Sequence, residues 1–164
     1  MDPSRNEGQM PIKLSLFSND LPDFFIIDHT GLADIAKIET DEDRRDATFE
    51  WTGPNLSFGE TGQLRRAVAP MGFCLRIATF DGFRIHSKFF EGITDPDVAD
   101  EVRADSTYTL ERAEIDPNQA SFRSVRFPDR FIRHRDFQLF AEQVNTPAEL
   151  QSACFRIDSP LADE

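Results

Sequence analysis

The chain contains three histidines, and each of them follows a short apolar run that is typical of a β-strand. His29 comes after FFIID, His86 after FRI and His134 after FIR. A large apolar residue stands three places beyond each histidine, at Leu32, Phe89 and Phe137. Histidine in one recurring context indicates an internal repeat, and a repeat constrains the possible folds more strongly than composition does.

A second signature follows each histidine after 17 to 19 residues. It combines an acidic residue or serine, a small residue, threonine or cysteine, and an aromatic residue. The three copies are DATF from Asp46, DSTY from Asp105 and SACF from Ser152. Further strand-like runs precede the histidines at 12–16, 74–77 and 121–125. We therefore predict three repeats, each with a strand, a strand that carries histidine, a turn-rich loop and a final strand.

Units of this size cannot bury a core alone, so the three repeats must share one. A closed threefold barrel with hairpin caps, the β-trefoil, meets this requirement and leaves few open edges. A six-bladed or sandwich arrangement explains the triplication less well. We predict an all-β protein, a single β-trefoil domain over 11–160 with repeats at about 11–58, 71–115 and 120–160. Residues 1–10 are expected to form a flexible polar tail, and 53–70 a surface excursion.

The net charge of −12 argues against nucleic-acid binding, which requires an excess of Lys and Arg. It also argues against binding to an anionic membrane surface. The N-terminus shows no signal-peptide pattern and no run is long enough to span a membrane, while the compartment stays open. One cluster is basic, and we interpret it as a solvated strand face rather than an anion site. Its members are Arg123, Arg126, Arg130, Arg133 and Arg135.

Neither the cysteines nor the acidic runs indicate a metal, a cofactor or a catalytic site. Cys74 and Cys154 lie in apolar runs without metal-site spacing, so we predict buried free thiols and no disulfide between them. The acidic run 41–43 lacks the spacing of a calcium loop. Three histidines around a threefold axis do not suit one tetrahedral metal site. A small hydrolase with paired carboxylates is the weaker alternative, because acidic runs in loops are usually solvated.

The stretch SFRSVRFPDRFIRHRDFQLF resembles the arabinose-binding (AbfB) domain of α-L-arabinofuranosidases, carbohydrate-binding module family 42. FIRH at 131–134 and DATF at 46–49 carry the resemblance, which extends over roughly 11–160. The resemblance implies a β-trefoil that binds L-arabinofuranose side chains of arabinoxylan or arabinan. It also implies one His/Asp pocket in each repeat and an associated glycoside hydrolase as a partner. The 164 residues leave no room for the hydrolase domain beside the trefoil, so we expect no catalysis.

Carried over by position, the resemblance implies six sugar-binding residues. They are His29 and Asp46, His86 and Asp105, and His134 and Ser152. A carboxylate can accept hydrogen bonds from two neighbouring hydroxyls, and imidazole can donate or accept. The family often has an aromatic residue directly after the histidine, where this chain has Thr30, Ser87 and Arg135. The alternative is a β-trefoil interaction module that has lost sugar binding, and the exposure of the His/Asp pairs distinguishes the two.

Overall fold

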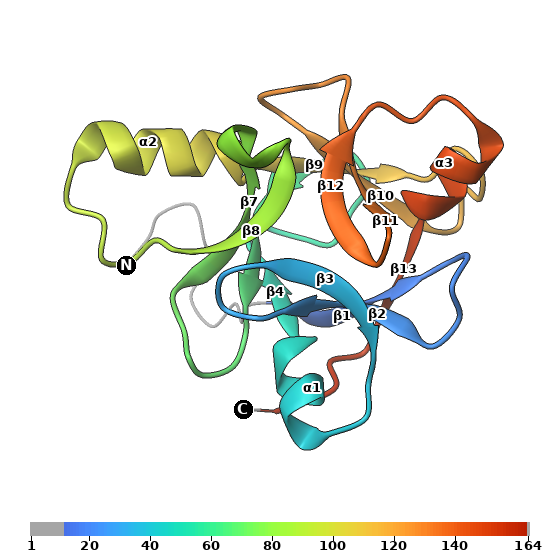
Figure 1. The fold of residues 1–164 in the computed structure, drawn as a ribbon, viewed down its shortest axis with the longest axis horizontal. Helices are drawn as coiled ribbons and strands as arrows, with labels where there is room; N and C mark the ends of the chain where they lie inside the picture. The colour runs from blue at the N-terminus through green and yellow to red at the C-terminus, as the bar shows by residue number, and fades with distance from the viewer. Residues whose placement is uncertain (1–11, 164) are drawn as a thin grey trace.

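The computed structural model describes residues 12–163, whose thirteen strands are joined in one sheet (Figure 1). The first repeat consists of β1 (Ile12–Ser18), β2 (Phe24–Asp28), β3 (Ala33–Lys37), helix α1 (Asp41–Asp46) and β4 (Phe49–Trp51). The second consists of β5 (Thr61–Gly62), β6 (Leu64–Arg66), β7 (Phe73–Ala78), the short 3-10 helix η1 (Thr79–Asp81), β8 (Arg84–Phe89), α2 (Pro96–Asp105) and β9 (Tyr108–Arg112). The third consists of β10 (Ala120–Ser124), β11 (Phe131–Arg135), β12 (Gln138–Glu142), α3 (Pro147–Ser152) and β13 (Phe155–Asp158).

Antiparallel pairing closes a barrel from strands of all three repeats. β1 pairs with β13 and β4, β4 pairs with β6, and β10 pairs with β9 and β13. β5, which precedes β6 directly, pairs with β9 and completes the ring. The hairpins β2–β3, β7–β8 and β11–β12 form the cap. This arrangement is the predicted β-trefoil, and Figure 1 shows α1, α2 and α3 at separate corners around the barrel.

The aromatic residue of the repeated signature forms part of the shared core. Phe49, Tyr108 and Phe155 each begin the last strand of a repeat, and all three side chains are fully buried. The Tyr108 hydroxyl, which burial would otherwise leave unpaired, donates to the Leu75 carbonyl at 3.1 Å. Truncation of a buried aromatic side chain typically costs about 3–5 kcal/mol, so this signature is needed for the fold whatever else it does.

Each repeat inserts a short helix immediately before its last strand. Thr40 and Thr146 cap α1 and α3 with reciprocal bonds to Asp43 and Glu149, and Asp95 caps α2. None of the helices within 12–163 is long and apolar enough to cross a membrane.

The predicted boundary of the second repeat is wrong. The stretch 53–70 is not a surface excursion, because it contains β5 and β6 and buries Leu64 and Val68. β6 pairs with β4 as β10 pairs with β9, so the second repeat begins near residue 61 rather than 71. The predicted N-terminal tail, 1–10, lies outside the described residues. Cys74 and Cys154 are buried free thiols, and burial raises the pKa of Cys154 to about 11.

Candidate functional site

Three contacts between neighbouring hairpins define which residues correspond in the three repeats. The three contacts share one offset. In each, a residue of one repeat pairs with the residue that lies two positions before the equivalent residue of the neighbouring repeat. The pairs are Asp34–Gln138, Phe140–Arg84 and His86–Leu32. His86 therefore corresponds to Asp34 and Phe140, on the second strand of each hairpin.

The first strands of the hairpins follow from the same register. Across each hairpin, the residues that face Asp34, His86 and Phe140 are Ile27, Arg76 and Arg133. The next residue along each first strand is Asp28, Ile77 or His134. The predicted equivalence of the three histidines is therefore wrong, because His29 lies one place beyond Asp28 and His86 lies on the other strand.

The helix-end signature, in contrast, marks corresponding positions. Asp46, Asp105 and Ser152 are the last residues of α1, α2 and α3. Each is followed by a helix-capping residue and then by the barrel strand with the buried aromatic. The helix-end residue of each predicted pair, Asp46, Asp105 or Ser152, thus lies at the same position in its repeat, whereas the histidine lies at a different position in each.

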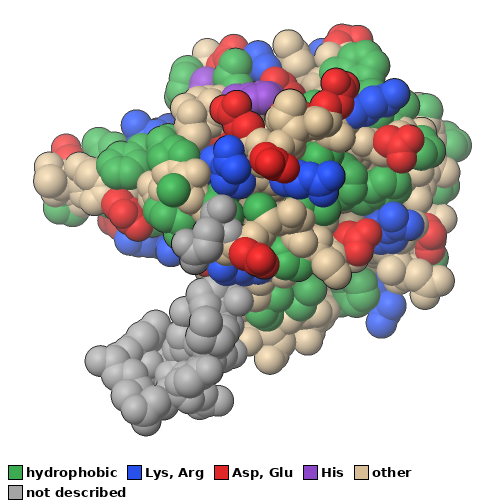
Figure 2. All heavy atoms as spheres, turned by 90° about the horizontal axis from the view of Figure 1, so that it is seen from below, with side chains coloured by type: hydrophobic (Ala, Val, Ile, Leu, Met, Phe, Trp, Pro, Cys, Tyr) green, Lys and Arg blue, Asp and Glu red, His purple; other side chains and the backbone are tan. Residues whose placement is uncertain are grey.

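In the first repeat, His29 and Asp46 line the same hollow, of about 330 Å³. The turn after β2, helix α1 and the loop at Ala69 and Pro70 form its walls. The His29 side chain is 47% exposed, and its Nε2 lies 3.6 Å from Asp34 Oδ2. Figure 2 shows histidine side chains at the upper edge of one face, among acidic, basic and apolar side chains. The His29 imidazole is therefore open to solvent, whereas the Asp46 side chain is only 14% exposed.

Arg66 forms the floor of this hollow and is only 3% exposed. Its guanidinium donates to the carbonyls of Val68 at 3.1 Å, Asp28 at 3.1 Å and Ala69 at 3.0 Å. Its Nη2 also lies 2.6 Å from Asp46 Oδ1. Among residues 12–163, Asp46 Oδ2 has no hydrogen-bond donor, so it is free to accept a hydroxyl of a ligand.

Asp28, at the position that His134 occupies in the third repeat, is a fully buried carboxyl group. Its Oδ1 accepts from the Thr30 amide at 2.6 Å, while its Oδ2 has no partner within the described chain. Burial raises the pKa of Asp28, and the Thr30 amide and Arg66 oppose this shift only in part. The folded protein therefore holds the proton to higher pH than the unfolded chain does.

We expect this carboxyl group to destabilise the protein as pH rises. Because the folded pKa lies above the unfolded value of 3.8, its contribution to stability is complete below pH 3.8 and is lost as pH rises through the folded pKa. Asp28→Asn keeps the acceptor for Thr30 and removes the titration. The difference in urea midpoint between the variant and the parent should move in favour of the variant as pH increases. A difference that does not vary with pH would contradict this account.

In the second repeat, Asp105 is fully buried between the guanidinium groups of Arg76 and Arg126. His86 faces Arg76 across the hairpin, and its Nε2 lies 2.8 Å from Asp81 Oδ2. Arg76 thus stands between the two residues that were predicted to share a sugar. The predicted pair His86 and Asp105 is closed by side chains of the protein itself.

In the third repeat, His134 is 9% exposed and its Nε2 lies 2.6 Å from Asp20 Oδ1. The Ser152 hydroxyl donates to the Glu149 carbonyl at 2.6 Å. The carboxylate beside His134 therefore comes from the loop after β1, in the first repeat, and not from the end of α3. No sequence pattern connected Asp20 with His134, so this partner was missed.

Four of the five arginines in the basic cluster of the third repeat form ion pairs with described residues, while Arg130 donates to the Ala141 carbonyl. Arg123 pairs with Glu111, Arg126 with Asp105, and Arg133 and Arg135 both with Glu142. These pairs support its interpretation as a solvated strand face. Within 12–163, no three His, Cys, Asp or Glu side chains are grouped so that they could hold a metal ion.

Known structures share this fold over nearly the whole chain. An arabinofuranosidase complexed with arabinofuranosyl-α-1,2-xylobiose matches 97% of the chain with 15% identity and a TM-score of 0.74. A GH54 α-L-arabinofuranosidase soaked with a cyclic sulfate inhibitor matches 96% with 14% identity and a TM-score of 0.74. The match covers 33% of each of these enzymes, so the chain spans about a third of their length. The BEL β-trefoil matches 93% of the chain, and 96% of its own length, with 12% identity and a TM-score of 0.65.

The sequence itself identifies the family. No curated protein matches the sequence. Residues 73–160, more than half of the chain, match the Alpha-L-arabinofuranosidase B (ABFB) domain. They contain the FIRH segment of β11 and the signatures at the ends of α2 and α3. The chain is therefore a member of the AbfB domain family and has its β-trefoil fold.

Proposed function

We propose that the chain is a non-catalytic carbohydrate-binding module that recognises an L-arabinofuranose side chain of arabinoxylan or arabinan. The observation that carries the proposal is the hollow that His29 and Asp46 both line, in a member of this family. The full length of the related enzymes suggests an associated glycoside hydrolase as the protein partner.

The chemistry of the hollow suits a neutral sugar. Arg66 donates to carbonyls and is ion-paired with Asp46 Oδ1, which holds the carboxylate in place and leaves Oδ2 for a hydroxyl. The half-exposed His29 imidazole supplies a second group that can donate or accept. A site that hydrogen-bonds specific hydroxyls discriminates strongly against ligands that lack them, because its polar groups then stay unpaired.

The other two predicted pockets contribute little to this proposal. The carboxylate of Asp105 and the imidazole of His134 are each bonded to charged side chains of the protein. We therefore expect one sugar site for each chain. Because a single site gives no avidity within one chain, binding should be weak unless the module is linked to others.

Retention on insoluble arabinoxylan tests the proposal, compared with the same polymer after removal of its arabinose branches. We expect retention that depends on the branches and that falls about tenfold or more in His29→Ala, since a site that loses a hydroxyl partner loses affinity on this scale. His86→Ala is the matched control, because His86 is also a histidine beside an aspartate. Equal retention on both polymers, or an equal loss in both variants, would refute the assignment of the site.

The second candidate is a β-trefoil interaction module that has lost sugar binding. The closed arrangements at Asp105 and His134 favour it, since two of three predicted pairs are occupied by the protein's own side chains. Negligible retention on both polymers, by a protein with an intact thermal transition, would support this candidate over the first.

A further inference from the structure

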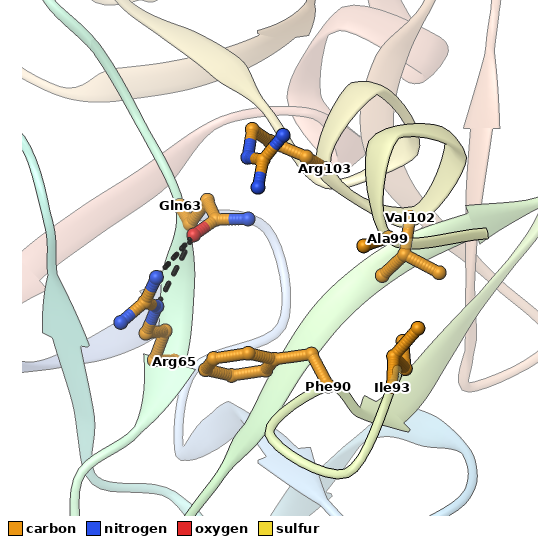
Figure 3. A pocket seen from close by; sticks show the side chains of 7 residues that line it. All are labelled: Gln63, Arg65, Phe90, Ile93, Ala99, Val102 and Arg103. Atoms are coloured by element: carbon orange, nitrogen blue, oxygen red, sulfur yellow. Dashed lines mark hydrogen bonds between the residues drawn. The ribbon is translucent and has the colours of Figure 1, made fainter. Parts of the chain in front are cut away.

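A pocket of about 220 Å³ lies between helix α2, strand β6 and the connection after β8 (Figure 3). We call it the α2 pocket. Phe90, Ile93, Ala99 and Val102 supply apolar surface, and Gln63, Arg65 and Arg103 supply the polar groups. It shares no lining residue with the hollow at His29 and Asp46. Figure 3 shows the Arg65 and Gln63 side chains on one side of the pocket and the helix residues on the other.

Arg65 is the cation of this pocket that has no anionic partner among residues 12–163. Its Nε and Nη2 donate to Gln63 Oε1 at 3.1 and 2.8 Å, and its guanidinium carbon lies 4.5 Å from the centroid of the Phe90 ring. Glu50 stands opposite on β4, yet within residues 12–163 Arg65 forms no ion pair with it or with any other carboxylate. Arg103 is already paired with Asp100 at 2.7 Å.

An arginine stands at the equivalent position of the third repeat, and its contacts show what an arginine at this position can bind. By strand register, Arg123 of β10 corresponds to Arg65 of β6, because β10 pairs with β9 as β6 pairs with β4. Arg123 also lines a pocket beside a helix, α3. Its Nε and Nη2 are bonded to the Glu111 carboxylate at 2.7 and 3.1 Å. Thr52 stands at the position that corresponds to Glu111, so the second repeat lacks this carboxylate.

We propose that the α2 pocket binds a small organic carboxylate with a flat apolar body. The ligand carboxylate takes the role at Arg65 that Glu111 has at Arg123, and forms the two-bond contact that guanidinium and carboxylate favour. The apolar body lies against Ile93, Ala99 and Val102. The neutral Gln63 amide is the weaker acceptor for Arg65, so a charged ligand oxygen can displace it.

Titration with sodium benzoate at constant ionic strength, followed by two-dimensional amide NMR spectra, tests this proposal. We expect saturable shifts at Arg65, Phe90 and the residues of α2, with a dissociation constant on the order of 1 mM. Benzamide, which is neutral and of similar shape, should bind about tenfold more weakly or not at all. Absence of saturation up to about ten times that concentration of benzoate, or equal binding of benzamide, would overturn the proposal.

Three variants locate the site. Arg65→Gln should weaken benzoate binding about tenfold or more. Arg112→Gln is the matched control, because Arg112 also stacks on a phenylalanine, Phe58, at 4.5 Å, and it should leave binding unchanged. Ala99→Leu, which fills the pocket from a helix that tolerates leucine and keeps Arg65, should also abolish binding. Equal binding by Arg65→Gln and Arg112→Gln, or unchanged binding by Ala99→Leu, would refute the assigned place.

Discussion

Replacement of Arg66 with methionine should lower the free energy of unfolding by about 3–5 kcal/mol. The side chain is 3% exposed, donates to three carbonyls and forms an ion pair with the Asp46 carboxylate. Methionine has similar length but no donor, so it would leave these acceptors buried and unpaired. The free energy of unfolding from denaturant titration measures this effect. The hollow at His29 should also lose its shape, since Arg66 holds α1 to the loop at Ala69.

Arg45→Met is the control for this prediction. Arg45 lines the same hollow from α1 but is exposed and forms no ion pair within the described residues. Its replacement should change the free energy of unfolding by less than about 0.5 kcal/mol. If the two variants were equally stable, the bonds of Arg66 would not be what holds the first repeat together.

Asp105→Ala should have the second large effect, again about 3–5 kcal/mol of lost stability. Asp105 is 0% exposed and accepts from both Arg76 and Arg126. The Arg76 side chain is itself only 11% exposed and would lose its sole ion-pair partner in the described chain. An unpaired charge in such a place is costly, because neither water nor a carboxylate offsets its desolvation.

Asp100→Ala, on the same helix α2, is the matched control. Asp100 is also paired with an arginine, Arg103, at 2.7 Å, but both side chains are about 70% exposed. Exposed pairs of this kind contribute at most about 0.5 kcal/mol, so this variant should unfold almost as the parent does. A comparable loss in both variants would show that burial does not set the strength of the Asp105 contacts.

The fold was predictable because one of the repeated sequence signatures contains a residue that the shared core requires. A helix end and a buried aromatic recur in each repeat, at Phe49, Tyr108 and Phe155. Each repeat contributes this aromatic residue to the shared core, so the signature is present in all three repeats. The β-trefoil follows from it even though the residues between the copies differ.

Matching the three repeats by their histidines gave the wrong equivalent positions, because residue type was given more weight than spacing. Asp28 precedes Asp46 by 18 residues, and His134 precedes Ser152 by the same 18. In the second repeat the corresponding residue, Ile77, precedes Asp105 by 28, because the β7–β8 turn, the connection after β8 and α2 are all longer. Insertions in surface connections cost little free energy, so spacing through them is an unreliable guide to register.

The side chains that contact the predicted site residues could not be predicted from sequence patterns. Asp20, which is bonded to His134, stands 114 residues before it in the chain. Arg66, which forms an ion pair with Asp46, lies on a strand that was predicted to be a loop. The apolar residues Leu64 and Val68 in this stretch could have indicated a buried segment. The sequence shows which side chains are charged. Which of them form ion pairs between different repeats is determined by how the barrel closes.

Because β1 pairs with β13, the barrel closes only when segments from opposite ends of the described chain meet. The Ser15 hydroxyl and the Ser159 carbonyl, which are bonded beside this pairing, are 144 residues apart. Contacts of such large sequence separation slow folding, since chain entropy is lost before they form. During synthesis, one edge of β1 stays unpaired until β13 has emerged from the ribosome. This interval is when the nascent chain is most exposed to edge-to-edge association with other chains.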